Sequence, residues 1–244
     1  MKIALQLYSI REITEKHGLC AALDQAKELG YDGIEFAGLF GLDANHAKAE
    51  LDKRGLGCAG FHDGYTDVLE HTDAMIEKAK ICGAYSLCVP YFDADSAEEW
   101  TDFAKKLDAA GEKFQKAGIR LGYHNHEHEI KPIAPGIRPI DIILANSSPK
   151  NVFFEMDTRH VKAAGEDPAA LAKKYAGRIP VLHARDWDGN DDCEVGGGLI
   201  DFEATVREGG MPEWFVVENE NEDLARNIRQ NAASVAYLRK TFRH

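Results

Sequence analysis

The sequence predicts an α/β fold, a single (β/α)8 barrel domain that spans residues 1–244. The chain length lies close to the ~250 residues typical of such barrels. Strand-like and helix-like segments alternate from end to end, and no serine- or proline-rich linker divides them. The runner-up is an open doubly wound sheet. Its first strand is usually followed by Gly-x-Gly-x-x-Gly, where this chain has SIREITEKHG.

Eight apolar segments bounded by glycine, proline or polar clusters are expected to form the barrel strands. In order they are KIALQLYS (2–9), YDGIEF (31–36), LGCAGFH (56–62), AYSLCVP (84–90), IRLGYHN (119–125), NVFFEMD (151–157), IPVLHARD (179–186) and EWFVVEN (213–219). Between them, segments such as residues 19–30 and 96–118 carry apolar residues at helical spacing that would dock on a sheet. Glycines such as Gly55 and Gly83 precede strands, where a left-handed residue ends a helix.

Composition and charge restrict the possible partners. The formal net charge of −12 repels phosphate backbones, so we expect no nucleic-acid partner. The chain has no apolar run of bilayer-spanning length, and MKIALQLYSIR lacks the features of a signal peptide, so we expect no membrane partner. The five cysteines are scattered and form no Cys-x-x-Cys pair, which is atypical of a disulfide framework. A cytoplasmic location is the expectation.

Polar residues gather at the C-terminal ends of the expected strands, where barrel enzymes place their chemistry. These residues are Gln6, Tyr8, Glu35, His62, His124, His126, Glu155, Asp157, His183, Arg185, Glu218 and Glu220. Carboxylates and imidazoles from several strands suit a divalent cation that keeps open positions for substrate. Such an ion acidifies a proton next to a carbonyl, and a carboxylate can remove or return that proton. These residues alone indicate a metal-dependent barrel enzyme without naming its reaction.

Several of these residues also have simpler interpretations. Glu155 and Glu220 could be surface groups or could support the ligands, and Glu35 could cap a helix or pair with Arg11. The segment EVGGGLIDF could be a plain turn or a phosphate-binding loop after the seventh strand. A His-x-His zinc motif of the amidohydrolase type belongs on the first strand, and that strand offers only Gln6 and Tyr8 in its place.

Seven motifs occur in a fixed order along essentially the whole chain: ALQLYSIR, GYDGIEFAG, LGYHNHEHEI, MDTRHV, GRIPVLHARDWDG, VGGGLIDF and WFVVENE. Together they resemble the sugar phosphate isomerase/epimerase family of xylose isomerase-like TIM barrels. That group includes inosose dehydratases, ketose 3-epimerases and abasic-site endonucleases.

The resemblance implies a metal held by two glutamates, an aspartate and a histidine. Those ligands would be Glu129, Asp157, His183 and Glu218, with Glu127 as the rival for the first position. Glu129 and Glu218 would then be the acid/base pair.

The remaining expected site residues would surround the substrate. His124 and His126 would contact substrate hydroxyls or orient the ligands. His160 would be an extra ligand, a proton carrier or a substrate contact. Gln6, Glu35 and His62 are further expected substrate contacts. Arg185 stands where many relatives have lysine, and a guanidinium can clamp an oxyanion but cannot carry a proton.

The function implied by the resemblance is a sugar isomerase or epimerase that depends on Mn, Mg, Co or Zn and forms an enediolate. The alternative is a lyase or dehydratase acting on a keto-sugar or keto-inositol. An abasic-site endonuclease and a non-catalytic sugar-binding barrel are weaker candidates. The substrate would be a sugar or keto-sugar, and a homo-oligomer is possible.

Overall fold

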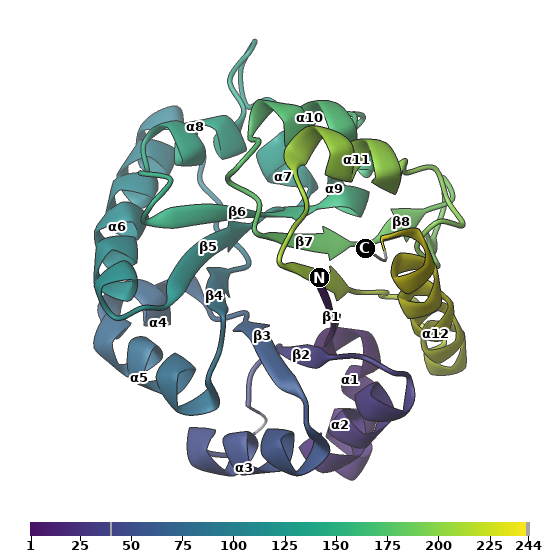
Figure 1. Ribbon diagram of the computed structural model, residues 1–244. Coiled ribbons are helices and arrows are strands. Elements are labelled where there is room, and N and C mark those ends of the chain that lie inside the picture. Colours follow the sequence, from purple (N-terminus) through teal and green to yellow (C-terminus); the bar gives the residue numbers. More distant parts are fainter. Residues whose placement is uncertain (40, 243–244) are drawn as a thin grey trace.

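A computed structural model describes residues 1–39 and 41–242. Within these residues, eight parallel strands form one sheet in the order β3-β2-β1-β10-β7-β6-β5-β4. Parallel bridges from Cys58 to Ala84 and from His62 to Cys88 join the β3 and β4 edges, so the sheet closes on itself. Helices surround this ring of strands (Figure 1). The predicted (β/α)8 barrel is confirmed.

The eight barrel strands fall within the eight predicted segments. They are β1 Lys2–Gln6, β2 Gly33–Phe36, β3 Gly57–Phe61, β4 Ser86–Val89, β5 Arg120–His124, β6 Val152–Asp157, β7 Val181–Ala184 and β10 Trp214–Val217. In two segments the chain leaves the barrel strand early and forms another element. The first turns into the 3-10 helix η1, Leu7–Ile10, because the Gln6 side chain caps it by accepting from the Tyr8 N–H. The seventh leads into an antiparallel hairpin of β8, Asp186–Trp187, and β9, Asp192–Cys193.

Along the chain, the helices lie between consecutive strands, except α12, which follows the last strand. They are α1 Arg11–His17, α2 Leu19–Glu28, α3 Ala44–Arg54, α4 Tyr65–Glu70, α5 Thr72–Cys82, α6 Ala97–Lys116, α7 Glu127–Ile130, α8 Pro139–Ala145, α9 Thr158–Ala163, α10 Pro168–Lys174, α11 Phe202–Gly209 and α12 Leu224–Thr241. Helix α6 begins where the Ser96 hydroxyl accepts from the Glu99 N–H. Gly55 and Gly83 end α3 and α5 in the left-handed conformation, as expected.

The barrel interior changes from apolar to polar along its axis. A small buried cluster fills one part of the interior and consists of Ala4, Ala59, Cys88, Phe153, Val181, Trp214 and Val216. The Trp214 ring fits there because Gly33 and Gly57 carry no side chain; a Cβ at either would lie 2.9 or 3.2 Å from the indole. Further along the strands the interior is lined by carboxylates and imidazoles. Because this apolar cluster fills one part of the interior, the carboxylates and imidazoles lie toward the C-terminal strand ends.

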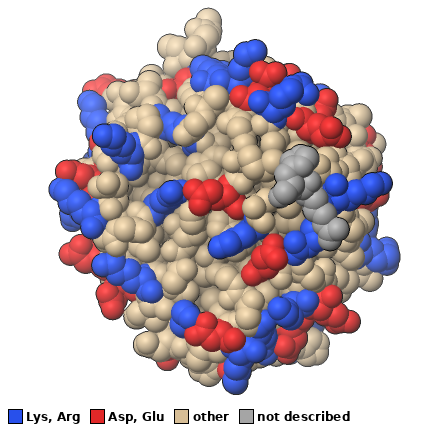
Figure 2. All heavy atoms as spheres, viewed as in Figure 1, with Lys and Arg blue, Asp and Glu red and all other residues tan. Residues whose placement is uncertain are grey.

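The charged surface and the helices bear on the expected partners. On the face in Figure 2, Lys and Arg side chains alternate with Asp and Glu side chains over the rim of the molecule. No large area of one sign stands out on the part of that face that is described. None of the helices that the structure describes has both the length and the apolar character needed to cross a membrane.

Candidate metal centre and barrel mouth

Strand register brings the expected polar residues together. His124 at the end of β5 lies beside Glu155 of β6, and Asp157, two residues further along β6, lies beside His183 of β7. The Asn125 side-chain oxygen accepts from the Asp157 N–H at 2.9 Å, which ties the end of β5 to β6. Imidazoles and carboxylates from neighbouring strands therefore meet inside the barrel.

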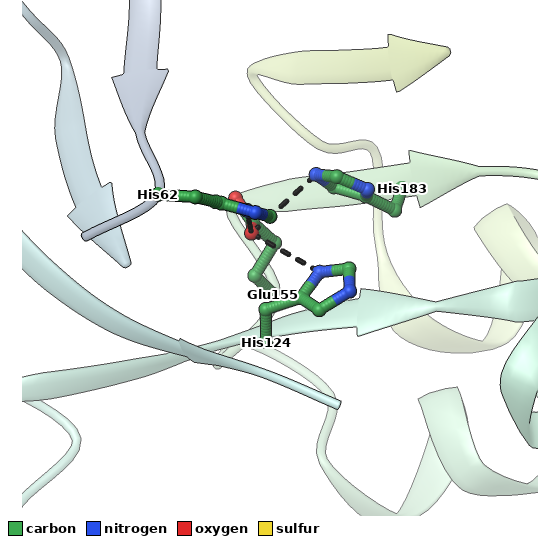
Figure 3. Close-up of side chains that lie close together, drawn as sticks. All are labelled: His62, His124, Glu155 and His183. Carbon is green, nitrogen blue, oxygen red and sulfur yellow. Dashed lines mark hydrogen bonds and ion pairs between the residues drawn. The ribbon is translucent and has the colours of Figure 1, made fainter. Parts of the chain in front are cut away.

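A deep group consists of His62, His124, Glu155 and His183, each offering one atom within 4.8 Å of the others (Figure 3). The side chains converge on Glu155, whose Oε2 lies 2.7 Å from His62 Nε2 and 3.3 Å from His124 Nδ1. The same oxygen lies 3.4 Å from His183 Nε2. One carboxylate oxygen thus faces three imidazole nitrogens.

Glu35 of β2 lies against this deep group. Its Oε2 accepts from Gln6 Nε2 at 2.8 Å and lies 2.8 Å from His183 Nε2 and 3.2 Å from His62 Nε2. Gly60 leaves room for the carboxylate, because a Cβ there would lie 2.9 Å from Glu35 Oε1. Glu35 is fully buried. The structure therefore places Glu35, an expected substrate contact, behind the imidazoles. Gln6, by contrast, lines a cavity at the mouth of the barrel.

An upper group consists of His124, Asp157, His183 and Glu218, again with one atom each within 4.8 Å. His183 Nδ1 lies 3.3 Å from Glu218 Oε2, and His124 Nε2 lies 4.0 Å from Asp157 Oδ2. Asp157 Oδ1 accepts from the His160 N–H at 2.9 Å. Within the described residues, however, Asp157 Oδ2 and His183 Nδ1 are buried without a hydrogen-bond partner. Buried polar atoms are rarely left unpaired, and two carboxylates with two imidazoles suit a divalent ion, so these residues fit one.

Arg185 extends the upper group toward the β8–β9 hairpin. Its Nη1 lies 3.5 Å from Asp157 Oδ2, 3.4 Å from Glu218 Oε2 and 2.9 Å from Glu220 Oε1. Its Nη2 donates to Asp192 Oδ2 at 2.7 Å. The guanidinium is almost completely buried and offsets the negative charge of the carboxylates around it.

The environment shifts the pKa of each upper carboxyl differently. Burial raises the pKa of Asp157 to about 6, even though Arg185 favours its charged form. Burial also acts to raise the pKa of Glu218, but the charges of Arg185 and His183 outweigh it and lower that pKa below its ordinary value. Two carboxyls in one group therefore differ in proton affinity.

The environment also shifts the pKa values of the imidazoles. Burial lowers the pKa of His126 to about 4 and holds the pKa of His124 well below its usual value. Burial alone would lower the pKa of His183 as well, but the carboxylates of Glu155 and Glu35 raise it. These shifts favour the neutral form of His124 and His126, in which imidazole binds a metal or accepts a hydrogen bond.

The structure does not bring Glu129 together with Asp157, His183 and Glu218. Glu129 Oε1 accepts from the Tyr123 hydroxyl at 2.6 Å, and Oε2 accepts from the His126 N–H at 2.7 Å, which caps helix α7. Burial raises the pKa of Glu129 to about 7. Neither group found among the described residues includes Glu129. The structure therefore does not bring Glu129 to the other three expected ligands, because the chain turns into α7 directly after β5.

The rival, Glu127, lies elsewhere too. It accepts from Arg159 Nη1 at 2.8 Å and from Lys131 Nζ at 3.0 Å. The carboxylate that does join the imidazoles is Glu155, for which the sequence also allowed a surface or a supporting role. The sequence did indicate this position for Glu155. Glu155 and Asp157 are two residues apart in a strand, so their side chains lie on one face of β6.

Two cavities open beside these groups. A mouth cavity of about 410 Å³ is lined by Gln6, Tyr8, Ala37, His62, Pro90, Tyr91, His124, His126, Glu218 and Glu220. A side cavity of about 440 Å³ is lined by Arg159, His160, Arg185, Arg226 and residues 190–192 and 220–223. Glu220 lines both. The rings of His126 and His160 lie 4.7 Å apart, so these two expected contacts meet where the cavities adjoin.

The glycine-rich loop after β8 and β9 is occupied by a side chain of the protein itself. Asp186 Oδ2 accepts from the N–H groups of Gly196 and Gly198 at 2.9 and 3.0 Å, and Oδ1 accepts from Ile200 N–H at 3.2 Å. These amides are the ones a phosphate would need. The structure therefore favours the plain-turn interpretation of EVGGGLIDF.

Comparisons with known proteins agree with this architecture. The family described as "Xylose isomerase-like TIM barrel" matches residues 23–241. An inosose dehydratase of Lacticaseibacillus casei is 24% identical over 257 residues, covering 84% of this chain and 83% of that protein. A sugar phosphate isomerase/epimerase from Parabacteroides distasonis superposes with a TM-score of 0.84 at 23% identity, covering 99% of both chains. The IOLI protein with a bound zinc atom superposes with a TM-score of 0.78 at 16% identity over the full length of both.

Proposed function

Because the chain belongs to the xylose isomerase-like TIM barrel family, we propose that it is a divalent-metal-dependent sugar isomerase or epimerase. It would abstract a proton next to the carbonyl of a sugar or keto-sugar and return it. The names of its relatives support a sugar-type substrate, and the zinc in the IOLI protein supports a metal. Mn, Mg, Co and Zn all suit a mixed shell of carboxylate and imidazole.

The observation that carries the proposal is the upper group of His124, Asp157, His183 and Glu218. Two of its atoms, Asp157 Oδ2 and His183 Nδ1, have no hydrogen-bond partner in the described part of the chain. Two of its members, His124 and Glu218, also line the mouth cavity. An ion held there would be within reach of a bound sugar.

When bound, the divalent ion would stabilise the negative charge that develops on the substrate oxygens during proton removal. Glu218 belongs to the upper group and lines the mouth cavity, so it is the proposed base. His126 and Glu220 line the same cavity and are the proposed groups that return the proton. The Arg185 guanidinium, 2.9 Å from Glu220 Oε1, would orient that carboxylate.

The second candidate is a lyase or dehydratase, which shares the first proton abstraction. It is favoured by the curated relatives matched here, several of which are named inosose dehydratase. Elimination needs an acid for the leaving group. Glu220, which lines both cavities, is the proposed acid for that outcome.

Elemental analysis followed by a keto-sugar screen in deuterated water tests the proposal. We expect a stoichiometric divalent metal and deuterium in recovered substrate or its epimer; loss of water would identify the lyase. Glu218→Gln should abolish exchange. Its matched control is Glu213→Gln, a change to an exposed carboxylate paired with Arg120 outside both cavities. Unchanged exchange in Glu218→Gln would contradict the role of Glu218.

A further inference from the structure

His183 is one of two residues shared by the deep and upper groups, and its two ring nitrogens face different partners. Its Nε2 lies 2.8 Å from Glu35 Oε2. Its Nδ1 lies 3.3 Å from Glu218 Oε2 and, among the residues described, has no hydrogen-bond partner. One side of the ring is therefore held by the protein, and the other side is free to bind.

Glu35 is held rigidly in the position that this contact needs. Gln6 Nε2 donates to the same Oε2 at 2.8 Å, so that oxygen has hydrogen-bond partners on two sides. The glycine at position 60 gives the carboxylate its space, because a Cβ there would lie 2.9 Å from Oε1. Glu35 is fully buried and lines neither the mouth nor the side cavity. It is placed to act through His183 and not on a substrate.

A carboxylate in this position decides which nitrogen of an imidazole carries the proton. When Nε2 of the neutral ring donates to Glu35, Nδ1 is left with a lone pair, and that lone pair points toward Glu218. Histidines that bind metals commonly donate their other ring N–H to a carboxylate in this way, which fixes both the tautomer and the ring orientation.

We propose that Glu35 is a positioning residue that holds His183 with Nδ1 directed at the ion site formed with Asp157 and Glu218. This inference rests on the proposed metal-dependent function and adds the device that organises its ion site. It also replaces the expected role of Glu35 as a substrate contact.

The deep group is the rival location for the ion. There Glu155 Oε2 faces His62, His124 and His183, and His183 would bind through Nε2. Glu35 would then share a nitrogen with the ion and would compete with it or bind it directly. The two arrangements use opposite nitrogens of His183, so they predict different responses to substitution.

The test compares Co²⁺ binding by wild-type protein, Glu35→Gln and Glu35→Leu. Glu35→Gln keeps an acceptor oxygen without the charge, and Glu35→Leu removes the acceptor. We expect Co²⁺ affinity to fall by about 10-fold and about 100-fold respectively, with one ion still bound and a changed absorption spectrum. Glu50→Gln is the matched control, because Glu50 is a buried carboxylate of α3 bonded to Lys53 and Arg54.

A second readout uses no metal. Nitrogen NMR of the metal-free protein, recorded at a pH where the His183 ring is neutral, should show that ring protonated at Nε2 in the wild type, and this preference should be lost in Glu35→Leu. If the Glu35 variants fail to fold, Gln6→Leu removes one donor to the same carboxylate oxygen. It should weaken Co²⁺ binding in the same direction by a smaller factor.

The outcomes separate the two claims. Equal Co²⁺ affinity in the wild type and in Glu35→Leu would overturn the role of Glu35 and leave the metal-dependent function standing. Loss of Co²⁺ binding in Glu155→Gln, with binding intact in Asp157→Asn, would overturn it by placing the ion in the deep group. A wild-type chain that binds no Co²⁺, Mn²⁺ or Zn²⁺ would overturn the metal-dependent function itself.

Discussion

At the residue scale, the site depends on which atoms of each side chain are already used. Asp157 Oδ1 accepts a hydrogen bond from the His160 N–H, while its buried Oδ2 accepts from no described donor. Both oxygens of Glu129 accept hydrogen bonds, from the Tyr123 hydroxyl and the His126 N–H. Residue type alone could predict that a carboxylate is available near His124. It could not show that one carboxylate is free and the other committed, because that depends on contacts formed only in the folded chain.

Asp157→Asn should therefore reduce the divalent metal content of the purified protein to near zero. The substitution preserves shape but removes the charged oxygen that we assign to the ion. Asp108→Asn serves as the control, because Asp108 is an aspartate outside the barrel interior that accepts from Ser148 N–H and Asn151 Nδ2. Elemental analysis of both variants is the measurement, and full metal occupancy in Asp157→Asn would count against the assignment.

At the element scale, short segments after the strands decide where functional side chains point. Helix α7 starts three residues after β5 ends, which directs Glu129 back onto Tyr123. The β8–β9 hairpin turns Asp186 toward the glycine loop. The apolar runs of the strands predict their positions well, because each strand must bury both faces. The four-residue α7 and the two-residue β8 and β9 carry no comparable periodic signal in the sequence.

Glu129→Ala should destabilise the protein without removing its metal. Two donors, the buried Tyr123 hydroxyl and the partly buried His126 N–H, would lose their acceptor, at a cost of about 1–3 kcal/mol in the free energy of unfolding. Urea unfolding measures this cost, and elemental analysis of the same sample shows whether the metal is retained. Loss of metal from a protein that remains folded would restore Glu129 as a ligand.

Asp141 of α8 pairs with Lys174 of α10, and this contact should make a part of the free energy of unfolding depend on pH. Burial acts to raise the pKa of Asp141, but Lys174, Tyr175 and Arg138 outweigh it and lower that pKa. A carboxyl whose pKa is lowered in the folded state stabilises the protein at pH values above its unfolded-state pKa of about 3.9. This stabilisation is lost as the pH falls from there through the lower folded-state pKa. Asp141→Asn should therefore be less stable than wild type at pH 7, with a smaller difference near pH 3. A difference that is the same at both pH values in urea unfolding would refute this role.

At the scale of the whole molecule, barrel closure gathers residues that are far apart in the chain. Gln6 and Glu35 from the first two strands meet His183 from the seventh segment, through hydrogen bonds that span up to 148 positions of sequence. The order of the strand segments predicts that their C-terminal ends share one rim. It does not predict that the polar side chains divide into a deep group and an upper group. This division depends on strand register and on the glycine at position 60, which leaves space for Glu35.

An ion that ties four strands together should stabilise the whole fold. Binding to the native state alone adds RT ln(1 + [L]/Kd), which is about 2.7 kcal/mol when the free metal is 100-fold above Kd. Treatment with a chelator should therefore lower the melting temperature, and added Mn²⁺ or Zn²⁺ should restore it. The same experiment on Asp157→Asn should show no metal-dependent shift, and an equal shift there would place the ion elsewhere.

The most direct measurement is an anomalous difference map from crystals grown with Mn²⁺ or Zn²⁺. We predict a single peak about 2.0–2.3 Å from an oxygen of Asp157, an oxygen of Glu218, a ring nitrogen of His124 and Nδ1 of His183, with Nε2 of His183 still bonded to Glu35. A peak bonded instead to Nε2 of His183 and to Glu155, or no peak within reach of Asp157 and Glu218, would contradict it.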